Sequence, residues 1–219
     1  MRSRTALVTV VTTLGLLVGG TPAVAGTWRA PDPVRDVAGT RHVAHPKPCG
    51  TDTPVDATDV SDADITGLKV RNQRRAVRIG VGMREVTESG DHGLSLRLRT
   101  PRGDFLLSVS REQGDVITSQ PMQLPPDLDE AQTDECGGLA FTSAAPYCDG
   151  VTASYLPGPG RIEVEIRHRC LPGARSWVRV GVSAFTQVGK TWFIDTWGPR
   201  GATYSLERPV LGRRVRAAR

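Results

Sequence analysis

The sequence predicts an all-β protein, a single antiparallel β-sandwich of about seven to eight strands that carries disulfides and follows a cleaved signal peptide. Apolar and polar residues alternate with a period of two in many segments after residue 63. The 24 glycines and 16 prolines are spread between these segments as turn residues. No amphipathic helical run accumulates, and with only 5% aromatic residues the core must consist mainly of Val, Leu and Ile.

The first 25 residues read as an export signal. Arg2 and Arg4 precede an apolar stretch over residues 6–18, and Ala23-Val24-Ala25 provides a small-x-small cleavage site. The apolar stretch is shorter than the roughly 20 residues that a membrane-spanning helix needs, so we expect no transmembrane segment. Cleavage after residue 25 of the 219 leaves a secreted, extracellular chain.

We expect three parts after the signal peptide. Residues 26–62 are rich in Pro and Asp and predict an arm or linker, residues 63–207 the β-sandwich domain, and residues 208–219 a frayed basic tail. The formal net charge is +5, and Arg far outnumbers Lys among the 28 basic residues. GC-rich coding explains this bias better than a phosphate-binding design, so nucleic acid is not an expected partner.

The alternation predicts the strands one by one. Turn residues divide them at 72–75, at Pro101–Asp104 and at Pro157–Gly160, so the first four strands are expected to form two successive hairpins of a meander. Residues 112–147 are irregular, and the acidic stretch 127–135 is expected to be a surface loop. The predicted strands cover residues 68–71, 77–83, 94–99, 105–109, 151–155, 162–166, 177–182 and 192–196.

Four cysteines in an exported chain allow three pairings. Cys148 precedes one strand of the hairpin that turns at Pro157–Gly160, and Cys170 follows the other, so folding this hairpin would bring the two cysteines together. Cys49 and Cys136 would then form the second disulfide and tie the arm to the acidic loop. A redox role would need a closely spaced Cys-x-x-Cys pair, which the chain lacks.

Catalytic motifs are absent from the sequence. The nearest approach to a Gly-x-Ser-x-Gly nucleophile elbow, at residues 93–97, lacks its last glycine and lies in a strand. There is no His-Glu-x-x-His run, and the four histidines and four cysteines do not have the spacing of zinc ligands. We therefore expect a protein that is not an enzyme and that has no bound cofactor, with Ca²⁺ as the one candidate ion.

The candidate Ca²⁺ ligands crowd thirteen residues before the first predicted domain strand, with one further carboxylate near the C-terminal end of the domain. Ca²⁺ takes six to eight oxygen ligands, and two such loops could supply them together. The simpler interpretation is a solvated acidic linker, because the spacing is not that of an EF-hand loop. The candidates are Asp52, Asp56, Asp59, Asp62, Asp64 and Asp195.

Two surfaces are candidate carbohydrate sites. Trp192 and Trp197, with Tyr204 nearby, could stack on sugar rings, although Trp192 in the core and Trp197 over a turn is the simpler interpretation. A cationic sheet face could dock acidic polymers if the strands that carry it are neighbours, although such rows are usually just solvated. Its residues would be Lys69, Arg71, Arg97, Arg99 and Arg179.

Four segments carry a resemblance: Asp62–Ile65, Val70–Asn72, Arg169–Gly173 and Trp177–Gly181. On these the chain resembles a group of secreted β-sandwich proteins of high-GC Gram-positive bacteria that has no known activity. The resemblance implies the fold and the extracellular location and nothing about a ligand.

Two functions remain as expectations. The first is a secreted, non-enzymatic binding protein for cell-wall or extracellular carbohydrate. The alternative is an inhibitor of extracellular proteases that presents a disulfide-pinned loop, residues 135–147, to the protease cleft. The partner is accordingly a polysaccharide or an extracellular protein.

Overall fold

The computed structural model describes residues 26–43, 51–87, 91–125, 148–198 and 209–218. These residues form an all-β protein with two antiparallel sheets, and the helical structure among them is a single 3-10 turn, η1 (His168–Cys170). Within the same ranges, no helix has the length and hydropathy that crossing a membrane requires.

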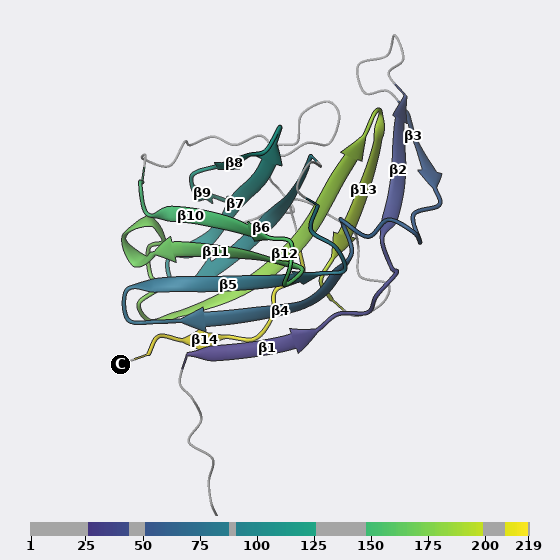
Figure 1. Ribbon diagram of the computed structural model, residues 1–219. Coiled ribbons are helices and arrows are strands. Elements are labelled where there is room, and N and C mark those ends of the chain that lie inside the picture. The colour runs from purple at the N-terminus through teal and green to yellow at the C-terminus, as the bar shows by residue number, and fades with distance from the viewer. Residues whose placement is uncertain (1–25, 44–50, 88–90, 126–147, 199–208, 219) are drawn as a thin grey trace, which may run out of the picture.

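One sheet has five strands in the order β1-β4-β5-β11-β10. In Figure 1 these strands run across the picture in front of the other sheet. The strands are β1 (Thr27–Pro31), β4 (Ile65–Asn72), β5 (Ala76–Met83), β10 (Val151–Leu156) and β11 (Arg161–Arg167).

The other sheet has nine strands and the main order β3-β2-β13-β12-β6-β7-β8, with β14 paired to β12 and β9 paired to β7. Its long strands rise diagonally behind the first sheet in Figure 1. The strands are β2 (Ala38–Val43), β3 (Thr51–Val55), β6 (His92–Thr100), β7 (Gly103–Glu112), β8 (Asp115–Thr118), β9 (Met122–Gln123), β12 (Trp177–Val188), β13 (Thr191–Thr196) and β14 (Val215–Arg216).

Both sheets contribute to one main hydrophobic core. Alternate residues of β5, such as Ile79 and Val81, pack in the same cluster as Leu96 of β6 and Val180 of β12. Each aliphatic side chain buried in this way contributes roughly 1.5–3 kcal/mol. The period-two pattern in the sequence therefore arises because each of the two sheets buries one of its faces.

The predicted strands are confirmed, but the predicted meander is wrong. The hairpin β4–β5 belongs to the five-stranded sheet, whereas β6–β7 belongs to the other, so the chain changes sheets between the two hairpins. Alternation shows that a strand has one buried face, and does not specify which strand lies beside it.

The segment 26–62, expected to be an arm or linker, contains three strands. Strand β1 pairs with β4, and β2 pairs with both β13 and β3. Pro31 ends β1 and Pro54 lies in β3, and both strands are at sheet edges. An edge strand tolerates proline because one row of its N–H groups needs no partner in the sheet, so these prolines mark edges rather than a linker.

The C-terminal segment, expected to be frayed, is also held to the sheet. Val215 of β14 lies opposite Val178 of β12 and is buried. The Ala218 N–H donates to the carbonyl of Asn72, which ties the same segment to β4.

The predicted disulfide between Cys148 and Cys170 is confirmed, with a Cα–Cα distance of 5.6 Å. Strands β10 and β11 pair in the register that places Val151 opposite Ile166, so the open end of the hairpin brings the two cysteines together. Three predictions lie outside the described residues: the signal peptide 1–25, the disulfide between Cys49 and Cys136, and the loop 135–147.

Candidate functional site

The predicted cationic face is not formed as one surface. Lys69 and Arg71 lie on β4 of the five-stranded sheet, whereas Arg97, Arg99 and Arg179 lie on neighbouring strands of the other sheet. A shared docking surface required the strands that carry these five cations to be neighbours. They belong to two different sheets, so this requirement is not met.

The three arginines of the nine-stranded sheet already have partners. Asp104 accepts hydrogen bonds from Arg97 Nη2 at 2.7 Å and Arg99 Nη2 at 2.8 Å. Arg179 donates to the carbonyl oxygens of Gly212 at 2.8 Å and Leu211 at 3.0 Å. These arginines already form hydrogen bonds to groups of the protein itself, so we do not assign them to a ligand site.

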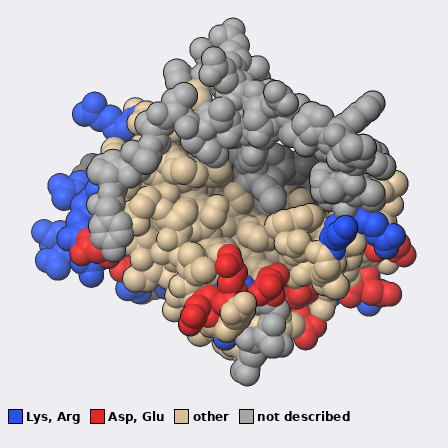
Figure 2. All heavy atoms as spheres, turned by 90° about the horizontal axis from the view of Figure 1, so that it is seen from above, with Lys and Arg blue, Asp and Glu red and all other residues tan. Residues whose placement is uncertain are grey.

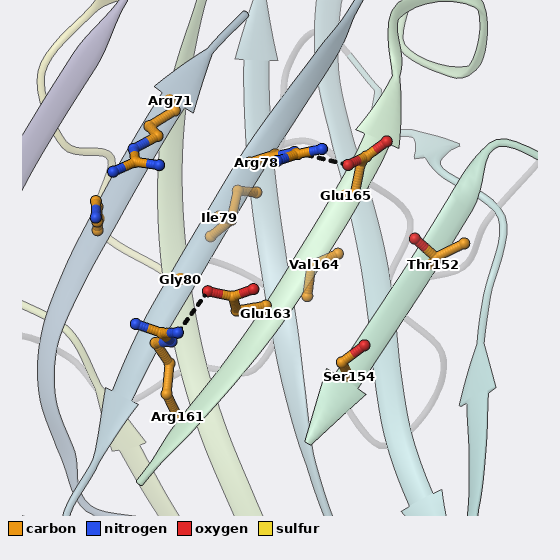
Figure 3. A pocket seen from close by; sticks show the side chains of 11 residues that line it. Arg71, Arg78, Ile79, Gly80, Thr152, Ser154, Arg161, Glu163, Val164 and Glu165 are labelled. Atoms are coloured by element: carbon orange, nitrogen blue, oxygen red, sulfur yellow. Dashed lines mark hydrogen bonds and ion pairs between the residues drawn. The ribbon is translucent and has the colours of Figure 1, made fainter. Parts of the chain in front are cut away.

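The outer face of the five-stranded sheet carries a hollow of about 400 Å³ (Figure 3). Gly80 lies at its centre, opposite Lys69 on one side and Glu163 on the other. A Cβ at position 80 would approach no atom closer than 3.7 Å, so the missing side chain leaves real space. Glycine is unfavourable inside a strand and often marks a place where another molecule approaches the backbone.

The charges around this hollow are of two kinds. Arg78 pairs with Glu165 at 2.7 Å and Arg161 with Glu163 at 2.9 Å, as the dashed lines of Figure 3 show. Lys69 and Arg71, and Arg29 on the adjacent strand β1, form no ion pair within the described residues. The pKa of Lys69 is lowered, first by partial burial and then by repulsion from Arg29, Arg71 and Arg161. The three unpaired cations thus repel one another.

The hollow belongs to a row of three. A second hollow of about 320 Å³ shares Lys69, Gly80 and Arg161 with the first. A third, of about 750 Å³, shares the Arg29–Pro31 segment with the second and reaches the C-terminal segment. The first two form a groove on the outer face of the sheet between β10 and β1, and the third lies past the β1 edge, because Trp28 shares the core-facing side of β1 and β4 with the buried Val70.

The predicted aromatic platform is not assembled as expected. Trp197 contacts Trp28 edge-to-face at a centroid distance of 5.1 Å, whereas Trp192 lies beside Phe185 at 5.9 Å. Trp192 lies near the start of β13 and Trp197 just past its end, and five residues of extended chain span about 16 Å, so the two rings do not form one platform. Tyr204 lies outside the described residues.

Trp28 and Trp197 line the third hollow of the row, together with Arg29, Arg213 and Arg214. The indole Nε1 of Trp197 donates to the carbonyl of Pro31 at 3.2 Å, which fixes the ring against β1. Nothing in the sequence pointed to Trp28, because 169 positions separate it from Trp197 and the contact forms only in the folded chain.

The six predicted Ca²⁺ ligands separate into two groups. Asp56 and Asp59 are exposed, and the Asp56 carboxylate accepts from the amide and hydroxyl of Thr58. Asp62 accepts from Thr186 Oγ1 at 3.0 Å, and the side chain of Asp52 lies outside the described structure. None of Asp56, Asp59 and Asp62 belongs to a shared ion site in the described part of the chain.

Asp64 and Asp195 are fully buried and lie close together, with the Ile65 amide donating to Asp195 Oδ2 at 2.7 Å. They are joined by Asp32 and Asp36, two residues of the supposed linker that the sequence analysis missed. Burial raises the pKa of Asp32 to about 8 against the Gly198 amide that lowers it, and Asp195, Asp36 and Asp64 raise it further. Burial likewise raises the pKa of Asp195 to about 7 and also raises the pKa of Asp64.

Figure 2 shows how unevenly charge is distributed on the upper face of the molecule. Acidic side chains gather along the lower side of a broad surface of uncharged residues. Lys and Arg side chains lie mostly at the left and right of this surface. Acidic and basic groups therefore occupy largely different parts of this face.

Comparisons with known proteins give no identity for this fold and its sites: no protein-family model, no curated protein and no solved structure matches the chain.

Proposed function

We propose that this chain is a secreted, non-enzymatic β-sandwich protein that binds an anionic extracellular or cell-wall polysaccharide along the outer face of its five-stranded sheet. The observation that carries the proposal is the groove of two adjoining hollows on this face, where Arg29, Lys69 and Arg71 form no ion pair with any residue that the structure describes.

The electrostatic argument rests on the difference between paired and unpaired cations. Arg78 and Arg161 are neutralised by glutamates and gain little from an added anion. Arg29 and Lys69 lie directly opposite each other on strands about 4.8 Å apart and repel each other. A polymer with regularly spaced negative charges would relieve this repulsion, and a groove lets it contact several cations at once.

The polar and aromatic groups of the groove suit a sugar better than a simple anion. Thr152 and Ser154 lie at one end of the row and supply hydroxyl groups. Trp28 and Trp197 line the third hollow past the β1 edge, where an aromatic ring offers a further contact for the apolar face of a sugar ring.

An extracellular location is part of the proposal. The disulfide between Cys148 and Cys170 fits a chain that folds in an oxidising compartment, as the N-terminal export signal also predicts. The alternative, a protease inhibitor, depends on the loop 135–147, and no described contact favours it.

The test compares two double variants that lose the same charge. Lys69→Ala/Arg71→Ala changes the groove, whereas Arg41→Ala/Lys190→Ala changes two exposed cations near the β2–β13 pairing of the other sheet. Binding is measured to immobilised teichoic acid, which carries phosphates, to hyaluronan, which carries carboxylates, and to neutral dextran. We expect retention on at least one anionic polymer, weakened about tenfold by the groove variant at roughly 0.7 kcal/mol per cation, and unchanged in the control.

The same binding should weaken as salt rises, because added ions screen exposed charges. Two results would contradict the proposal: absence of binding to both anionic polymers at low salt, or equal weakening by the two double variants.

A further inference from the structure

Four aspartates from distant parts of the chain meet beside the start of β4. Asp32 follows β1, Asp36 precedes β2, Asp64 precedes β4, and Asp195 lies in β13. One carboxylate oxygen from each of Asp32, Asp36 and Asp195 lies within 4.8 Å of the other two. Asp64 is close enough to raise the pKa of both Asp32 and Asp195 by repulsion. Asp64 is therefore counted as the fourth member of this aspartate cluster.

The carboxylates are held in place through one oxygen each. Asp32 Oδ1 accepts from the Gly198 amide at 2.9 Å, and Asp195 Oδ2 accepts from the Ile65 amide at 2.7 Å. Asp64 Oδ2 accepts from the Arg35 amide at 2.9 Å and pairs with Arg84 at 3.1 Å. Three side chains are thus oriented by the backbone, as ligands of a bound ion usually are.

The other oxygen of each of these three side chains is buried and has no hydrogen-bond partner in the described structure: Asp32 Oδ2, Asp64 Oδ1 and Asp195 Oδ1. Asp32 is 8% exposed, and Asp64 and Asp195 are 0% exposed, so bulk water does not reach these oxygens. A buried acceptor without a partner is costly, and a buried carboxylate much more so. Two of these side chains, Asp32 and Asp195, belong to the group whose carboxylate oxygens lie within 4.8 Å of one another, and this concentration of buried acceptors calls for a positive ligand.

We propose that Asp32, Asp36 and Asp195, with Asp64 beside them, bind a Ca²⁺ ion. Carboxylate oxygens are the ligands of hard cations, whereas zinc sites favour nitrogen and sulfur. Mg²⁺ demands near-ideal octahedral geometry and gives up its waters reluctantly, whereas Ca²⁺ accepts irregular sets of six to eight oxygens. Carboxylates gathered from separate parts of the chain therefore suit Ca²⁺ better. Asp36 is partly exposed and gives the ion a route from solvent.

The ion adds a link between segments that strand pairing and the small hydrophobic cluster around Val37 and Ala63 also hold together. It connects the β1–β2 link, which carries Asp32 and Asp36, to the beginning of β4 and to β13, and so bridges the two sheets. Because β1 also carries Arg29, the ion fixes the edge of the sheet whose outer face holds the groove. The site itself shares no residue with the three hollows, and its test is independent of polysaccharide binding.

The first experiment titrates the oxidised mature protein, freed of metal with EDTA, with CaCl₂ and separately with MgCl₂ by calorimetry and thermal unfolding. We expect saturable Ca²⁺ binding and a rise in Tm of about 5–10 °C at 100 times the Kd, with a smaller response to Mg²⁺. Terbium luminescence that Ca²⁺ quenches gives a second, direct readout of the same site.

The variants separate this site from general acidity. Asp32→Asn and Asp195→Asn each remove one ligand charge at nearly constant shape, and Asp59→Asn removes an exposed aspartate of the same acidic region. Both cluster variants should weaken Ca²⁺ binding at least tenfold, and the control should bind like the wild type. In EDTA the cluster variants should remain folded, because the substitution also removes a repelling charge.

Three outcomes overturn the proposal. These are no binding heat or Tm shift with Ca²⁺, no terbium luminescence, or equal weakening by Asp59→Asn and Asp195→Asn. The first two would mean that protons, rather than a metal ion, neutralise the buried carboxylates.

Discussion

Replacement of Asp104 by Asn should destabilise the protein strongly, because this one carboxylate neutralises two arginines. Asp104 is 8% exposed and faces Arg97, whose side chain is 15% exposed, and Arg99, whose side chain is 43% exposed. Asn keeps the shape but offers one acceptor oxygen and no charge. Arg97 would then be left largely buried without a counter-charge.

The magnitude follows from the two exposures. Removing one partner of a buried ion pair costs about 3–5 kcal/mol. The half-exposed Arg99 adds only about 0–1 kcal/mol, because water screens its charge, and the residual exposure of Arg97 reduces its share. We expect a loss of about 2–4 kcal/mol in the free energy of unfolding, which in a chain of this size lowers Tm by roughly 5–15 °C.

The pH dependence of this loss is a second measure of the same interaction. Burial by itself would raise the pKa of Asp104, but the hydrogen bonds and charges of Arg99 and Arg97 outweigh it and lower the pKa below its usual value. The stabilisation is therefore complete above the unfolded-state pKa of about 3.9 and is lost as the pH falls through the lower folded-state pKa. The difference between wild type and Asp104→Asn should be constant from pH 5 to 8 and shrink below pH 4.

Urea unfolding at pH 7 and at a series of acid pH values measures both quantities. Asp115→Asn, an exposed aspartate on the adjacent strand β8, is the matched control and should change the free energy of unfolding by less than about 0.5 kcal/mol. A loss below 0.5 kcal/mol for Asp104→Asn, or a loss that persists unchanged at pH 3, would refute the reasoning.

Two further predictions concern the backbone and the disulfide. Gly212→Ala places a Cβ 2.1 Å from the ring of Trp28, so we expect a loss of about 1–3 kcal/mol, measured by urea unfolding, whereas Gly158→Ala meets no atom within 4 Å and should be nearly neutral. Replacing Cys148 and Cys170 together by Ser opens a loop with a sequence separation of 22 and should cost about 3 kcal/mol in guanidinium unfolding; an unchanged midpoint would contradict this.

The strands were predictable because each has one buried face. In β5 the exposed Arg78 lies between the buried Val77 and Ile79, and the period of two recorded this burial directly in the sequence. The Cys148–Cys170 disulfide was predictable for a similar reason, since one hairpin turn fixes both cysteines. Local geometry decided these features, so a short window of sequence contained them.

The Asp104 interaction was within reach of the sequence but was missed. The turn at Pro101–Asp104 places Arg99 opposite Asp104 across the β6–β7 hairpin, and pairing across that turn would have removed Arg97 and Arg99 from the predicted cationic face. The prolines of β1 and β3 led to the wrong prediction of a linker over residues 26–62, because composition alone does not distinguish an edge strand from a linker.

By itself, the sequence determined the all-β class, the positions of the strands from residue 68 that alternate with a period of two, and the hairpin disulfide, because these depend on residues close together along the chain. It also placed Asp64 and Asp195 among six candidate Ca²⁺ ligands. Only the tertiary structure decided which strands are neighbours, that Trp28 rather than Trp192 meets Trp197, and that Asp32 and Asp36 complete the aspartate cluster. Asp32 and Asp195 are 163 positions apart, and such a contact depends on how two sheets are stacked, which no local pattern encodes.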